Sequence, residues 1–194
     1  MASRGQFLDD YEISLLVCDS DDSEDDRHND DDIGLSGSED EEIWVMYDCA
    51  TKYMMNAKVY LGKGNSEVAS GLASDVVCTL LQPFSGQDRG GRNVTTGNFF
   101  TSVDLENQLK NKKLTLFGAM KQNKREIPQE FNPARQRDEN SSIFGFTKEL
   151  TLVSYVSKKN KSVVLLSSLH HDSAICSDSG KPKSLNFITE QKMQ

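Results

Sequence analysis

From residue 43 onward, short apolar runs alternate with polar turns along the chain. The run Ile43–Asp48 is followed, after the polar residues 49–52, by a second apolar run over residues 53–61. Two runs of β-forming residues separated by about four turn residues are typical of a β-hairpin. The next segment predicts a helix that Pro83 ends, because apolar residues recur there at helical spacing: Val68, Leu72, Val76 and Leu80.

The second half of the chain predicts one more helix among several strands. A helix over residues 103–111 is expected, with Thr101 or Ser102 as its N-cap and two acidic residues in its first turn. Short β-forming runs predict strands over the following ranges: 93–96, 114–120, 143–146, 150–156 and 162–169. Lys158–Lys161 makes the turn of a hairpin between the last two. Strands and helices in this order predict a mixed α/β domain.

The charge divides the chain into two unequal parts. Residues 1–42 hold 16 acidic and two basic side chains, a net charge of −14, whereas residues 43–194 hold 14 acidic and 20 basic ones, a net charge of +6. So acidic a segment buries little apolar surface, and we expect it to be a disordered leader, with a short amphipathic helix over residues 7–17. It is either a solubilising leader without a partner or an interaction tail that mimics DNA and shields a basic face.

Composition excludes several classes of protein. No apolar run approaches the ~18 residues that cross a bilayer, and the N-terminus lacks the apolar core of a secretory signal. The four cysteines are far apart and form no close pair, which favours reduced thiols and an intracellular protein: Cys18, Cys49, Cys78 and Cys176. His170 and His171 are adjacent, and on a strand they would point to opposite faces, so we expect a loop or strand end instead of a metal site.

Several collinear blocks resemble the catalytic domain of piggyBac-type transposases. The first is Trp44–Gly64, which reads WVMYDCATKYMMNAKVYLGKG, and the likeness extends over residues 43–188. The other blocks are 94–102 (VTTGNFFTS), 117–128 (FGAMKQNKREIP), 150–155, 164–168 and 179–182. The resemblance implies a partial ribonuclease-H-like mixed sheet with flanking helices over residues 43–188, between the acidic leader 1–42 and a tail over residues 189–194.

The family resemblance also implies a catalytic site that this chain lacks in part. Such transposases cut and rejoin DNA with three carboxylates and two Mg²⁺ ions, which clamp the attacking and leaving oxygens. Asp48 matches the first carboxylate, expected at the end of the first strand, but the second position is Gly97. The third carboxylate lies farther downstream in the family, and we expect it to be missing here. Asp104 is the one substitute that proximity suggests.

We therefore expect a catalytically inactive, transposase-derived protein that holds no metal, with Asp48 as a vestigial ligand. The resemblance assigns DNA contact to the basic residues Lys121, Lys124 and Arg125, and it implies a nuclear location. The partners expected from it are DNA and related transposase chains, with no membrane and no small-molecule substrate. The alternatives are a domesticated DNA-binding or interaction module, and an element remnant without function or a stable fold.

Overall fold

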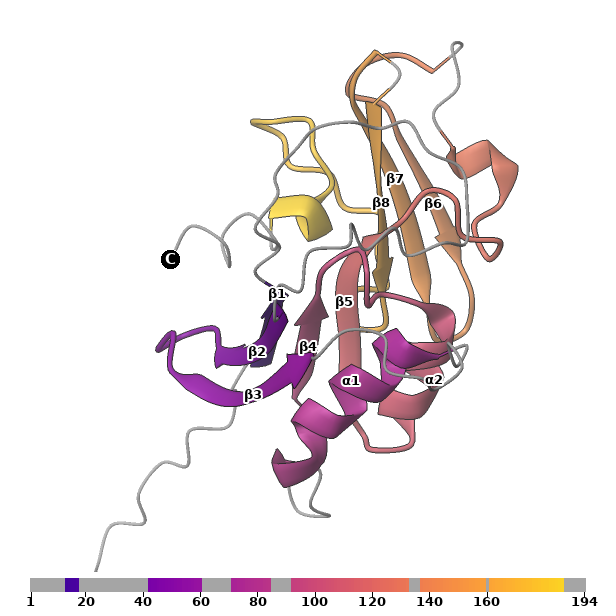
Figure 1. Ribbon diagram of the computed structural model, residues 1–194. Helices are drawn as coiled ribbons and strands as arrows, with labels where there is room; N and C mark the ends of the chain where they lie inside the picture. Colours follow the sequence, from indigo (N-terminus) through magenta and orange to yellow (C-terminus); the bar gives the residue numbers. More distant parts are fainter. Residues whose placement is uncertain are drawn as a thin grey trace, which may run out of the picture.

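The computed structural model describes residues 13–17 (backbone only), 42–60, 71–84, 92–132, 137–159 and 161–186. Eight strands form one sheet in the order β3-β2-β1-β4-β5-β8-β7-β6 (Figure 1). The strands are β1 (Ile13–Val17), β2 (Glu42–Asp48), β3 (Met54–Tyr60), β4 (Asn93–Thr96), β5 (Thr115–Met120), β6 (Ser142–Phe146), β7 (Thr151–Lys158) and β8 (Lys161–Ser167). The helices are α1 (Leu72–Leu81) and α2 (Val103–Lys110), with short 3₁₀ turns η1 (Gln82–Phe84) and η2 (Gln129–Phe131).

The sheet is mixed, which confirms the predicted α/β fold. β1, β2 and β3 pair antiparallel, whereas β1, β4 and β5 run parallel to one another. β8, β7 and β6 continue the sheet with antiparallel pairing. Both predicted hairpins are present, and the strand order places the carboxyl ends of β1, β4 and β5 at one edge of the sheet.

The strand β1 corrects two expectations about the N-terminal segment. Residues 7–17 were expected to include an amphipathic helix, but Ile13–Val17 form a strand between β2 and β4. This stretch therefore belongs to the sheet and not to a disordered leader. The physical reason is that β1 pairs with β2 along its whole length and with β4 at Ile13 and Ser14, and this backbone pairing outweighs local helical spacing. The rest of the acidic segment and the tail over residues 189–194 lie outside the described residues.

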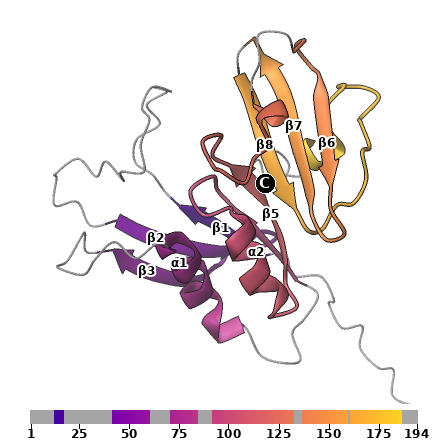
Figure 2. The ribbon, with the colours of Figure 1, turned by 90° about the vertical axis from the view of Figure 1, so that its right-hand side faces the viewer.

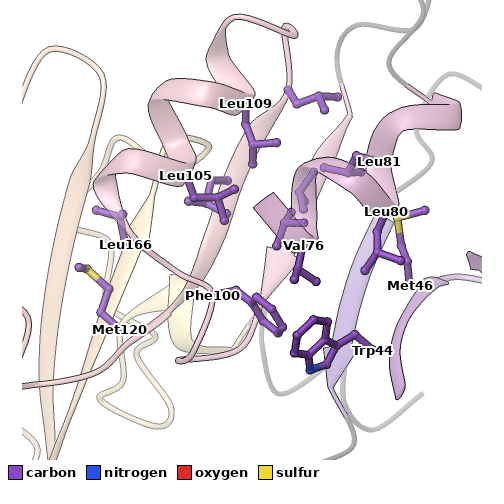
Figure 3. Packing of buried hydrophobic residues seen from close by; sticks show 14 of the residues in the cluster. Trp44, Met46, Val76, Leu80, Leu81, Phe100, Leu105, Leu109, Met120 and Leu166 are labelled. Carbon is purple, nitrogen blue, oxygen red and sulfur yellow. The ribbon is translucent and has the colours of Figure 1, made fainter. Parts of the chain in front are cut away.

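The main hydrophobic core lies between the sheet and the two helices, which cover one face of it (Figure 3). Val76 and Leu80 of α1 and Leu105 and Leu109 of α2 are fully or almost fully buried there. Trp44 of β2 packs edge-to-face on Phe100, with ring centroids 6.4 Å apart, an arrangement worth about 0.5–1.5 kcal/mol beyond its buried area. Trp44 and Phe100 thus join β2 to the turn before α2 within this core.

A second, smaller core lies under β5, β8 and β7. Phe117, Val153 and Leu165 are buried in it, and Leu185 of the C-terminal segment packs against them. Figure 2 shows that β6, β7 and β8 stand across the direction of β1–β3, as expected when twist accumulates over many strands. Through Leu185, the C-terminal segment packs on the face of β5, β8 and β7 that lies opposite the two helices.

The structure confirms the predicted cap of α2 and the loop at the two histidines, and it also describes three of the four cysteines. Ser102 is the N-cap of α2, and its Oγ accepts a hydrogen bond from Leu105 N at 3.1 Å. Cys49, Cys78 and Cys176 form no disulfide. His170 and His171 follow the end of β8 in a loop. In the described part of the chain, no helix is long and apolar enough to cross a membrane.

Candidate functional site at the edge where β4 and β5 end

The candidate site lies where the two parallel strands β4 and β5 end side by side. Their register pairs Thr96 with Gly118, so Gly97 follows β4 at the edge toward which Lys121 follows β5. In sheets of this kind ligands bind outside the carboxyl ends of parallel strands. The structure therefore brings Gly97 and the basic residues after β5 to the same edge.

Gly97 opens a tight turn that leads into α2. Its carbonyl oxygen accepts hydrogen bonds from Phe100 N (3.2 Å), Thr101 N (3.1 Å) and Thr101 Oγ1 (2.9 Å). A Cβ built on Gly97 would meet no heavy atom within 4 Å, and the residue is exposed. The position has room for a side chain but offers no side-chain ligand atom.

Lys121 lies over the aromatic part of this turn. Its Nζ is 5.3 Å from the centroid of the Phe99 ring, within the range of a cation–π contact. Phe99 in turn packs edge-to-face on the fully buried Phe100, with centroids 5.0 Å apart. The hydrophobic core thus fixes the ring that supports the lysine.

Lys124 and Arg125 extend the basic edge. A turn holds them, with Lys124 N donating to Lys121 O (3.3 Å) and Ile127 N donating to Lys124 O (3.1 Å). Burial lowers the pKa of Lys124, Glu126 and Asp104 raise it, and Lys121 lowers it further. The net effect is a lowered pKa of Lys124. Arg125 is exposed.

Asp48 lies elsewhere, at the end of the second strand and not of the first. It pairs with Ile13 of β1, and Ile13 pairs with Val94 of β4, three residues before Gly97. Three residues along a strand and two strand spacings across the sheet separate Asp48 from Gly97 by about 14 Å. Mg²⁺ binds its oxygen ligands at about 2 Å, so side chains this far apart do not bind one ion.

The carboxylate of Asp48 closes its own turn. Its Oδ2 accepts hydrogen bonds from Thr51 Oγ1 and from Thr51 N (3.2 Å). Asp48 N donates to Tyr53 O (3.0 Å), and Lys52 N donates to Asp48 O (2.8 Å). Asp48 is buried, and its Oδ1 has no hydrogen-bond partner. The side chain is thus placed as a β2–β3 turn residue.

The donor set at the β4–β5 edge does not fit a magnesium pair. Gly97 supplies no side-chain ligand, and Asp48 is about two strand spacings away. Asp104 is exposed in the first turn of α2, where its Oδ2 accepts a hydrogen bond from Gln108 Nε2 at 2.9 Å. Among the residues that the structure describes, no group of three His, Cys, Asp or Glu side chains could hold a metal ion.

Comparison with known proteins decides the family. A protein-family model described as Transposase IS4 matches residues 38–191. The chain belongs to this transposase family. It is also similar to the piggyBac transposase in a cryo-EM structure of its synaptic complex with hairpin DNA, with 39% sequence identity and a TM-score of 0.70. That match confirms the piggyBac-type resemblance and identifies a transposase-derived protein.

The match spans only part of that relative. It covers 78% of this chain and 32% of the piggyBac transposase chain. No curated protein matches the chain. Transposases of this family generally use a divalent metal ion.

Sequence reasoning missed three basic residues that belong to the same edge. β8 runs antiparallel to β5, with Met120 paired to Val164, so β8 begins where β5 ends. Lys158, Lys159 and Lys161 in the β7–β8 hairpin therefore lie beyond this edge. The sequence showed them as a basic turn, and only the strand register relates them to Lys121.

Proposed function

We propose that this piggyBac-type transposase-derived protein binds DNA without cutting it, and that it acts in the nucleus with DNA and related transposase chains as partners. The observation that carries the proposal is the composition of the β4–β5 edge. Where the family resemblance implies a carboxylate, the chain has Gly97, and the basic residues Lys121, Lys124 and Arg125 follow β5 at the same end of the sheet.

The proposed lack of catalysis follows from the geometry of the carboxylates. In-line phosphoryl transfer with two metals needs several carboxylates around ions about 3.5–4 Å apart. Asp48 instead accepts hydrogen bonds from Thr51 and lies about 14 Å from Gly97 by strand spacing. Asp104, exposed in the first turn of α2, does not by itself replace the set.

A nicking and strand-transfer assay tests this part of the proposal. The full chain is incubated with transposon-end and plasmid DNA in Mg²⁺ or Mn²⁺, with the Asp48→Asn variant and a protein-free sample as controls. We expect no product above the protein-free sample from either protein. Cleavage or joining by the wild type that Asp48→Asn abolishes would overturn the proposal.

DNA binding at the edge rests on electrostatics. Each phosphate that a lysine or arginine neutralises releases counterions, so affinity falls steeply with salt, with a slope of about −0.9 per contact on B-DNA. Lys121 and Arg125 are exposed and available for such contacts. The expected binding is therefore sensitive to salt and indifferent to sequence.

Fluorescence anisotropy with a labelled duplex tests the binding. We expect the Lys121→Gln, Lys124→Gln, Arg125→Gln triple variant to bind more weakly than the wild type and with a shallower salt slope. The matched control replaces Lys112, Lys113 and Lys148 by Gln, because these lie toward the opposite edge, near the starts of β5 and β7. Equal losses in both variants, or no binding by the wild type, would refute the assignment.

A further inference from the structure

We propose that the β7–β8 hairpin forms a second half of the DNA-binding surface, continuous with Lys121, Lys124 and Arg125. This inference rests on the proposed DNA binding and extends it to three lysines that neither the family resemblance nor the comparisons assign. The hairpin lysines are Lys158, Lys159 and Lys161, and all three are exposed.

The register of β5, β8 and β7 brings the two basic groups together. Met120, the last residue of β5, pairs with Val164 of β8, three residues after Lys161. Lys158 of β7 pairs with Lys161 across the hairpin. Figure 1 shows the hairpin projecting beyond the edge at which β4 and β5 end.

A side-chain bridge ties the two groups directly. The amide of Gln122, next to Lys121, donates hydrogen bonds to the backbone oxygen of Ser162 and to its Oγ at 3.2 Å. Ser162 follows Lys161 in the chain. The turn after β5 and the start of β8 are thereby held in contact, so the two basic groups occupy fixed relative positions.

The chemistry of this surface favours duplex DNA over a single strand. Stacking of unpaired bases needs an open aromatic face. Lys121 covers one face of Phe99, and Tyr155 of β7 is buried, with its hydroxyl bonded to Asn140 Oδ1 at 2.7 Å. The exposed groups along this edge that can bind DNA are therefore lysine and arginine side chains, which bind phosphates. From β4 to β7 the edge crosses three strand spacings, about 14 Å, which is less than one turn of B-DNA.

The carboxylate of Glu139 lies at the hairpin, and removing its charge provides a second test of the inference. Glu139 Oε1 accepts a hydrogen bond from the backbone N of Lys159 at 3.1 Å, so its negative charge sits at the hairpin. A duplex phosphate approaching Lys159 would be repelled by it. Glu139→Gln retains an oxygen that can accept the hydrogen bond while removing the charge.

The test compares salt-dependent binding of a labelled 20-base-pair duplex by full-length variants. We expect the Lys158→Gln, Lys159→Gln, Lys161→Gln triple variant to weaken binding and to reduce the salt slope by up to about 2.7. The Lys112, Lys113, Lys148 triple variant serves as the charge-matched control and should bind more tightly than the hairpin variant. Glu139→Gln should bind more tightly than the wild type, and a single strand of the same length should bind less tightly than the duplex.

Lysine footprinting separates failure of this inference from failure of the proposed function. Amine acetylation followed by mass spectrometry should show the duplex protecting Lys158, Lys159 and Lys161 together with Lys121. Protection of Lys121 without the hairpin, or a hairpin variant that binds like the wild type, would overturn the inference and leave DNA binding at Lys121 intact. A wild type that binds no duplex at low salt would overturn both.

Discussion

Gly97 and Gly118 lie near the ends of β4 and β5, and they differ in how much room each leaves for a side chain. Gly118 lies in β5 against the turn after β4, where a Cβ would meet Thr101 Oγ1 and lie 2.5 Å from Thr96 O. The close approach includes backbone, so the neighbours have little room to move. Gly97 directly follows β4, and a Cβ built there would meet no heavy atom within 4 Å. The position has room for a side chain, but glycine offers no side-chain ligand atom.

Alanine substitutions distinguish these roles. We expect Gly118→Ala to lower the free energy of unfolding by about 1–3 kcal/mol, because overpacking forces the backbone of β4 and the turn apart. Gly97→Ala should stay within about 0.5 kcal/mol of the wild type, since nothing meets the added carbon. Urea unfolding followed by circular dichroism measures both. Equal stability of the two variants would show that the packing between β5 and the turn is looser than described.

His170 gives the stability a pH dependence of known sign. Burial lowers its pKa, Asp172 raises it, and His171 lowers it, with a net decrease from 6.5. The unfolded chain therefore binds this proton more readily, so the stabilisation is complete above the ordinary pKa and is lost as the pH falls below it. We expect unfolding free energy to decline less between pH 7 and pH 5 in His170→Gln than in the wild type. The exposed neighbour provides the control variant, His171→Gln, which should stay closer to the wild type than His170→Gln does because His171 is the smallest cause of the shift. A His170→Gln curve that matches the wild type would contradict the assignment.

Single residues were predictable where local chemistry decides their role. The Ser102 cap and the burial of Trp44 and Phe100 follow from side-chain type and spacing. The role of Asp48 was not predictable from the sequence, because an aspartate at this position can either bind a metal ion or accept the hydrogen bonds that close a turn. Only the position of Thr51 and the separation from Gly97 decide between them.

At the scale of elements, strands and helices with strong periodicity were predictable and β1 was not. Ile13–Val17 is a short apolar run, and such runs do not distinguish a strand from a helix. Its partners β2 and β4 are about 30 and 80 residues away in the sequence, so pairing rather than propensity decides its structure. The basic edge shares this limit, because only the β5–β8 register places Lys121 and Lys161 at the same end of the sheet.

Removing β1 tests its place in the sheet. A chain that begins at residue 18 loses this strand and leaves facing backbone groups of β2 and β4 unpaired in the middle of the sheet. We expect its thermal transition to shift to a much lower temperature or to lose cooperativity. A chain that begins at residue 13 is the matched control, because it lacks residues 1–12 but keeps β1. If both chains melt alike, β1 does not belong to the cooperative unit.

At the scale of the whole molecule, the two faces of the sheet are covered unequally. Among the described residues, both helices lie on one face, and the C-terminal segment packs on the other under β5, β8 and β7. Under β2 and β3 the second face carries the cross-strand pair Ile43 and Val59, whose side chains are 49% and 50% exposed. Met54, at the start of β3, is 54% exposed. In the described part of the chain, β3 is also one of the two outermost strands of the sheet.

An apolar face beside an unpaired strand edge favours association between chains. We expect the wild type to show concentration-dependent self-association in sedimentation velocity, and Ile43→Thr with Val59→Lys to reduce it, because the lysine adds charge at the edge and the threonine keeps β-propensity. Ile175→Thr with Leu169→Lys is the control, since these residues are also exposed, at 51% and 39%, but lie outside β2 and β3. Equal reduction by both double variants would assign the association to general surface hydrophobicity, and persistence of it in the Ile43, Val59 variant would exclude this face as its cause.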